Sequence, residues 1–88
     1  MGTHYRVWIV RYEGWQPGGW QDVPPGAIAV EPAERRTMTA RQARRYVEAF
    51  NRAAQSGPQE IWAVALPVAI RYVGDLRPGE ALAASALP

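Results

Sequence analysis

The chain has 88 residues, of which 48% are hydrophobic, and it contains four Trp and four Tyr but no Cys. This composition is too apolar for a disordered chain, and the length predicts one domain, because two domains would each be too small for a core. Without Cys there is no disulfide framework and no thiolate metal site. The formal charge is only +2, so any attraction to phosphate has to come from local clustering of charge.

Composition also bears on the cellular compartment of the protein and on whether it binds nucleic acid or a membrane. All the basic residues are Arg and none is Lys, which the codon usage of a GC-rich genome produces, so the Arg content alone does not indicate nucleic acid. The apolar run at 61–70 is interrupted by Pro67 and is shorter than the ~20 residues of a membrane span. The run at 7–10 is shorter than the ~7–15 residues of a signal-peptide core. We therefore expect a cytoplasmic protein without a membrane partner.

The N-terminal third predicts two strands joined by a long loop. Residues 5–12 are rich in β-branched and aromatic side chains, and 7–10 are apolar at both parities, which indicates a strand covered on both faces. Residues 13–26 hold four Gly and three Pro and form a loop that contains two Trp. Residues 27–30 form a second strand, which is expected at an edge because prolines bracket it.

A helix is predicted at 40–55. Thr39 and Gln42 match a capping box, and Ser56-Gly57-Pro58 ends the helix, with Gly57 suited to the left-handed position after it. Helical spacing at about 100° per residue separates an inward apolar side from an outward charged side. The inward side is Ala43, Tyr46, Val47, Phe50 and Ala54, and the outward side is Arg41, Arg45, Glu48 and Arg52, with Arg44 at the flank.

Residues 61–73 alternate large and small side chains, which is strand periodicity. Pro67 marks either a bulge or a break into two strands. If the first and last strands are neighbours, a crossover through the helix would make them parallel, and an antiparallel arrangement is the alternative. The small residues would let the helix approach closely. The large residues are Trp62, Val64, Leu66, Val68, Ile70 and Tyr72, and the small residues are Ala63, Ala65 and Ala69.

Together these elements predict an α+β fold. We expect a small two-layer domain over residues 1–76, with a three- to four-stranded sheet and one amphipathic helix on one face, in ββαβ or ββαββ order. Residues 77–88 are Ala-rich and weakly patterned, and we expect a weakly ordered C-terminal tail.

The chain is poor in groups that perform catalysis. It has one His, His4, near the N-terminus, and its carboxylates and hydroxyls form no cluster in the sequence. Neither a dinucleotide-binding glycine pattern nor a P-loop occurs. We therefore expect no enzyme activity, no cofactor and no metal site.

Three sets of residues are candidates for binding. Guanidinium groups suit phosphate or carboxylate, so the helix arginines are candidates for nucleic acid or an acidic partner, although Glu48, spaced for ion pairs with Arg45 and Arg52, makes a solvated face the default interpretation. Trp15 and Trp20 either anchor a partner or cover the sheet. The third set is the large side of the last strand, which one helix cannot also hide. The arginine set is Arg41, Arg44, Arg45 and Arg52, and the candidate self-association face is Trp62, Val64, Leu66, Val68 and Ile70.

The sequence thus favours a non-catalytic protein–protein interaction module that self-associates as a homodimer or binds a small protein partner. An exposed apolar sheet face is most commonly buried in a two-fold dimer, formed by face packing or by pairing of a strand edge. The alternative is an RNA- or DNA-binding accessory protein that uses the Arg-rich helix face. No nucleic-acid-binding motif supports that alternative.

Overall fold

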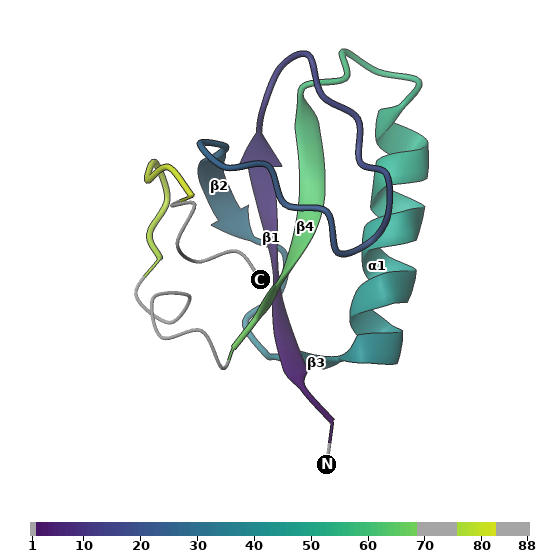
Figure 1. Ribbon diagram of the computed structural model, residues 1–88, viewed down its shortest axis with the longest axis vertical. Coiled ribbons are helices and arrows are strands. Elements are labelled where there is room, and N and C mark those ends of the chain that lie inside the picture. The colour runs from purple at the N-terminus through teal and green to yellow at the C-terminus, as the bar shows by residue number, and fades with distance from the viewer. Residues whose placement is uncertain (1, 69–75, 83–88) are drawn as a thin grey trace.

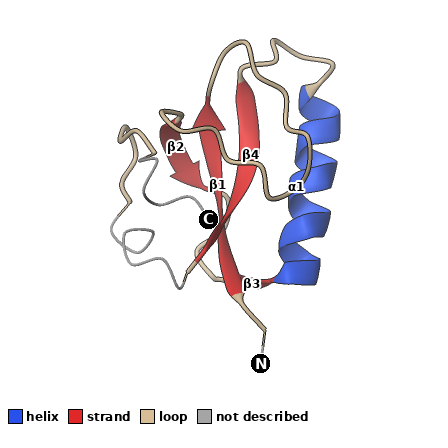
Figure 2. Cartoon of the chain, viewed as in Figure 1, coloured by secondary structure: helices blue, strands red, loops and turns tan. Residues whose placement is uncertain are grey.

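The computed structural model describes residues 2–68 and 76–82. It has two layers, a four-stranded antiparallel sheet and one helix on one of its faces (Figures 1 and 2). This confirms the predicted α+β class and, apart from a two-residue third strand, the ββαβ order. The elements are β1 His4–Arg11, β2 Ile28–Pro32, β3 Met38–Thr39, α1 Ala40–Ala54 and β4 Ile61–Pro67.

β1 is the central strand of the sheet. β4 pairs with it over residues 5–11 on one edge, while β2 and β3 pair with opposite ends of its other edge. All four side chains from Val7 to Val10 are buried, as their apolarity at both parities predicts. The parallel arrangement that a helix crossover predicted for neighbouring first and last strands is wrong, because β3 already runs antiparallel to β1. α1 then returns along the sheet, so β4 also enters antiparallel to β1 (Figure 1).

The sheet has a hydrophobic cluster on each face. The small side chains of β4 face α1 and its large side chains face the opposite side, as the alternation predicts. The helix-side cluster is Tyr5, Val7, Ile9, Met38, Ala43, Val47, Ala63 and Ala65. The far-side cluster is Trp8, Val10, Ala27, Ala29, Trp62, Val64, Leu66, Leu76 and Leu82.

Both ends of α1 are set by local hydrogen bonds. The capping box is present, because the Gln42 N–H donates to Thr39 Oγ1 at 3.2 Å and the Thr39 N–H donates to Gln42 Oε1 at 3.1 Å. The helix ends at Ala54, where a turn follows in which the Gly57 N–H donates to the Ala54 carbonyl at 3.1 Å. The left-handed position expected for Gly57 is instead taken by Gln59, with φ 59°.

The strand boundaries differ from the predicted ones by a few residues. β2 begins and ends later than the predicted 27–30, and β3 was not predicted because two residues carry no periodicity. β4 ends at Pro67, which cannot donate to a ladder. Residues 69–75, which include Ile70 and Tyr72, lie outside the described residues.

Residues 77–82, expected as the start of a weakly ordered tail, lie along the outer edge of β2. The Gly79 and Leu82 N–H groups donate to the carbonyls of Ala29 and Ala27 at 2.6 and 2.8 Å, and the Ala29 N–H donates to the Glu80 carbonyl at 2.8 Å. Gly79 has φ 90°, as the third residue of a type II turn requires, and follows Pro78, which is common at the second residue of such a turn. This turn therefore positions a fifth extended segment, and residues 83–88 lie outside the described residues.

Leu82 provides a test of this segment, because its side chain is 2% exposed within the far-side cluster. Leu82→Ala should lower the free energy of unfolding by about 2–5 kcal/mol, the usual cost of truncating a buried leucine. Urea denaturation measures this loss. Glu80→Ala, at an exposed position in the same segment, should change stability by less than about 0.5 kcal/mol. Equal effects of the two substitutions would show that Leu82 does not pack into the core.

Candidate functional site

The predicted self-association face on β4 is largely internal. Trp62, Val64 and Leu66 are at most 1% exposed within a single chain. Their burial removes these three side chains from the predicted face, because the covering groups come from other parts of the same chain, including Leu76 and Leu82. Val68 remains 39% exposed, and Ile70 lies outside the described residues.

The two loop tryptophans lie on opposite faces of the sheet. The Trp15 ring packs edge-on against Trp62 on the far side, with ring centroids 6.0 Å apart. The Trp20 ring packs edge-on against Tyr5 on the helix side at 5.2 Å. The loop returns to the far-side cluster at Val23, so it passes across both faces. Each indole is half-buried and covers part of the sheet.

Asn51 makes the most specific buried contact between α1 and the sheet. Its side-chain Nδ2 donates to the Ala63 carbonyl at 3.0 Å, and its Oδ1 accepts from the Ala63 N–H at 2.8 Å. The amide thus binds both backbone groups of Ala63, as a residue of a neighbouring strand would. Asn51 is 5% exposed. The helix pattern did not identify it, because asparagine in an amphipathic helix is ordinarily assigned to the polar side.

This contact protects the free edge of β4. The Tyr12 N–H donates to the Glu60 carbonyl and the Val68 N–H to the His4 carbonyl. The backbone N–H and carbonyl groups of even-numbered residues of β4 therefore bond to β1, and those of odd-numbered residues point to the free edge. Among the outward positions, Ala63 is bound by Asn51, and Pro67 has no N–H to donate. Two of the four outward positions are therefore closed to an added strand. The outer edge of β2 is paired with residues 79–82.

A small apolar surface remains on β2. Ile28 and Val30 are 40% and 36% exposed, and Val30 lies at a bulge where the register between β1 and β2 shifts. Ile28 is opposite Arg11. Arg11 is two residues after Ile9, which belongs to the helix-side cluster, so Arg11 and Ile28 lie on the same face of the sheet as α1. Glu31, opposite Ile9, is also exposed. We call these four residues, Arg11, Ile28, Val30 and Glu31, the β2 patch.

α1 leaves the β2 patch uncovered because the helix packs over β4 and β1 (Figure 1). Asn51 marks the flank of α1 that faces the free edge of β4. Tyr46 and Phe50 lie on the opposite flank, where their rings stack at 6.3 Å and remain half-buried. Tyr46 shares a shallow cavity with Met38 and Glu34, which places this flank on the β2 and β3 side of β1.

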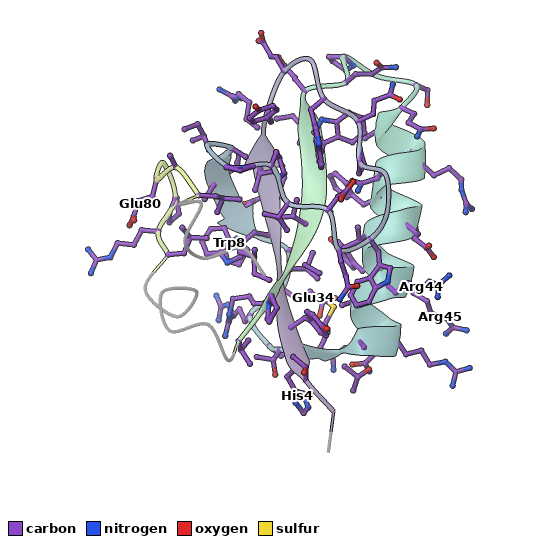
Figure 3. The ribbon with its side chains drawn as sticks, in the orientation of Figure 1. His4, Trp8, Glu34, Arg44, Arg45 and Glu80 are labelled. Carbon is purple, nitrogen blue, oxygen red and sulfur yellow. The ribbon has the colours of Figure 1, made fainter. Side chains whose placement is uncertain are left out.

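The helix arginines lie on the solvent side of α1, as predicted, and Figure 3 shows Arg44 and Arg45 extending away from the sheet. Glu48 pairs with Arg44, Nε to Oε2 at 3.3 Å, and not with Arg45 or Arg52 as its spacing suggested. No other carboxylate of the described residues lies within ion-pair distance of α1. Arg41, Arg45 and Arg52 thus form a row of guanidinium groups without a carboxylate partner among those residues, which we call the Arg stripe.

One cavity joins two of the predicted candidates. It has a volume of about 210 Å³ and lies between the loop and α1, with Gly18, Gly19, Trp20, Glu48 and Arg52 in its lining. Trp20 and Arg52 are therefore neighbours, whereas Trp15 lies on the other face of the sheet. Within the loop, the Gly18 N–H donates to the Asp22 carboxylate.

Within residues 2–68 and 76–82, no three His, Asp or Glu side chains are grouped for a metal ion. In the same part of the chain, no helix has the length and apolarity to cross a membrane. His4 is exposed at the start of β1 (Figure 3).

Comparison with known proteins gives no relative. No protein-family model, curated protein or solved structure matches the chain significantly.

Asn51→Leu tests the edge contact. The substitution leaves the N–H and carbonyl of Ala63 without their partner, and each unsatisfied buried group costs about 1–3 kcal/mol. We expect a loss of about 2–5 kcal/mol in the free energy of unfolding, measured by urea denaturation, and faster hydrogen exchange at the Ala63 amide. Gln55→Leu, at an exposed position one turn later, is the control and should leave Ala63 exchange unchanged. Unaltered exchange at Ala63 in Asn51→Leu would contradict the edge contact.

Proposed function

We propose that this chain is a non-catalytic interaction module that self-associates, and that the β2 patch is its contact surface. The observation that supports this most is the exposure of Ile28 and Val30 on the part of the sheet that α1 leaves uncovered. The absence of Cys fits a reducing compartment, and we place the module in the cytoplasm.

The chemistry of the patch favours burial against a protein. Ile28 and Val30 are exposed on one short strand, β2. They lie on the side of β1 toward which Tyr46 and Phe50 of α1 also point. Clustered apolar groups of this kind are typical of contact surfaces, whereas single exposed apolar residues are ordinary. A domain of this length also buries a smaller fraction of its surface on folding than a larger domain does. Covering the patch would add apolar burial to its core.

The charges around the patch fit a second copy of the same chain. Arg11 and Glu31 carry opposite charges and flank the two aliphatic side chains. In a two-fold dimer, a contact of one residue with a second residue of the copy is always made twice. Arg11 of one subunit would then lie opposite Glu31 of the other, twice per dimer. We favour packing of faces over pairing of edges, because Asn51, Pro67 and residues 79–82 occupy the strand edges.

A charge swap tests this proposal. Arg11→Glu should weaken the dimer, because two attractive contacts become repulsive, and a change of about 1.4 kcal/mol or more corresponds to a tenfold or larger rise in Kd. The double variant Arg11→Glu with Glu31→Arg should restore the wild-type Kd, because the pairs re-form with reversed polarity. Sedimentation equilibrium over a range of chain concentrations measures both values.

Two apolar variants complete the experiment. Ile28→Asp should give a folded monomer, since it places a charge in the interface. Val68→Asp changes the exposed member of the face predicted on β4, which lies outside the β2 patch. It should dimerise as the wild type does, and a monomeric Val68→Asp variant would place the interface on β4. A wild-type chain that sediments as a monomer at high micromolar concentration would overturn self-association. A dimer insensitive to Ile28→Asp would overturn the β2 patch as its surface.

A further inference from the structure

Positive charge is concentrated on α1. The helix carries four Arg and one Glu, a formal charge of +3, whereas the whole chain carries +2, so the remaining residues sum to −1. Glu80 lies on the side of the molecule opposite α1 (Figure 3). Glu34 lines a cavity together with Arg45 but is paired with Arg36. The protein is therefore polarised, with a basic helix surface on a nearly neutral body. A polarised surface of this kind steers an anionic partner toward one side.

The geometry of the Arg stripe suits an extended anion. Residues 41, 45 and 52 lie within about 40° of one another on a helical projection at 100° per residue, so they form a single row. With a rise of about 1.5 Å per residue, the row is roughly 16 Å long. A nucleic-acid duplex carries about nine phosphate charges over that length. Guanidinium groups can bind phosphate oxygens in a bidentate manner.

The only acidic side chain on α1 does not neutralise this row. Glu48 is paired with Arg44, which lies at the flank of the stripe. Arg41, Arg45 and Arg52 are exposed and have no carboxylate within ion-pair distance among the described residues. A solvent-exposed ion pair such as Arg44 and Glu48 contributes little to stability. Loss of Glu48 would therefore release a fourth guanidinium next to the stripe.

We propose that the Arg stripe binds the phosphate backbone of a nucleic acid, independently of the β2 patch. A lipid surface fits less well, because the apolar side of α1 is buried on the sheet at Ala43 and Val47 and cannot insert between acyl chains. Arginine contacts to phosphate fix a protein on the nucleic-acid backbone and carry no sequence information. The binding is therefore to phosphate and does not depend on sequence.

Salt dependence is the direct test. Fluorescence anisotropy with a labelled 20-base-pair DNA duplex and with single-stranded RNA of 20 nucleotides gives the association constant over about 20–200 mM salt. Three phosphate contacts predict a slope of log K against log salt near −2.7 for the duplex and near −2.1 for the single strand. Arg45→Gln should reduce the duplex slope by about 0.9. Scrambling the oligonucleotide sequence should leave the association constant and its salt slope unchanged.

Two further variants distinguish the stripe from general charge. Arg77→Gln removes the same charge from an exposed position beside β2, away from α1, and should leave the slope unchanged. Glu48→Gln should tighten duplex binding and move the slope toward −3.6, because a released Arg44 adds one contact. A merely solvated helix face would respond to neither Arg45→Gln nor Glu48→Gln in this way.

The proposal has three outcomes that would overturn it. The first is no binding to either nucleic acid at 20 mM salt. The second is an equal loss of salt slope from Arg45→Gln and from Arg77→Gln. The third is binding to phosphatidylserine vesicles without binding to nucleic acid. All variants replace exposed side chains, and unchanged thermal melts would verify their folding. Ile28→Asp should bind each oligonucleotide with the wild-type slope, so failure of self-association and failure of nucleic-acid binding are separable.

Discussion

The structure depends on the requirement to cover both faces of β1. This strand is buried at every position from 7 to 10 and is paired on both edges, so its neighbours have to supply two hydrophobic layers. One helix supplies only one of them. The second layer is assembled from segments without helix or strand periodicity, namely the loop that carries Trp15 and the extended residues 76–82. A chain of this length therefore uses its Gly- and Pro-rich segments as core.

The Asn51 amide links this packing to the strand edge. It binds the N–H and carbonyl of Ala63, so α1 is fixed to β4 by directional bonds in addition to the packing of Ala43 and Val47. A buried amide that satisfies two backbone groups specifies one position of the helix, because any shift would leave polar groups without partners. The same contact closes part of an edge that could otherwise pair with another chain. We propose the β2 patch and the Arg stripe as binding surfaces.

Much of the fold could be predicted from the sequence where the signal is local. The capping box at Thr39 and Gln42 defines the start of α1, and the alternation of Ala63 and Ala65 with larger residues correctly assigns the side of β4 that the helix approaches. These signals work because capping and side-chain direction depend on neighbouring residues. The outward position of the helix arginines follows from the same periodicity.

The parts that could not be predicted depend on contacts between distant residues. Trp62 and Val64 looked exposed because their covering groups include residues about 50 positions earlier and about 12–20 positions later in the chain. The helix pattern did not identify Asn51 as an inward residue, because its burial depends on the backbone groups of Ala63, which lie on a different element. A local signal was present in one case, since Pro78-Gly79 specifies the turn that places residues 79–82 beside β2.

Thiol accessibility tests most directly whether one chain covers both faces of its sheet. The natural chain has no Cys, so Val64→Cys and Val68→Cys each introduce a single reactive group at positions that are 0% and 39% exposed. Measured with a small thiol reagent under native conditions, Cys at 68 should react at nearly the rate of the unfolded chain. Cys at 64 should react only as fast as the protein opens. Rapid labelling at 64 in the folded protein would contradict the account.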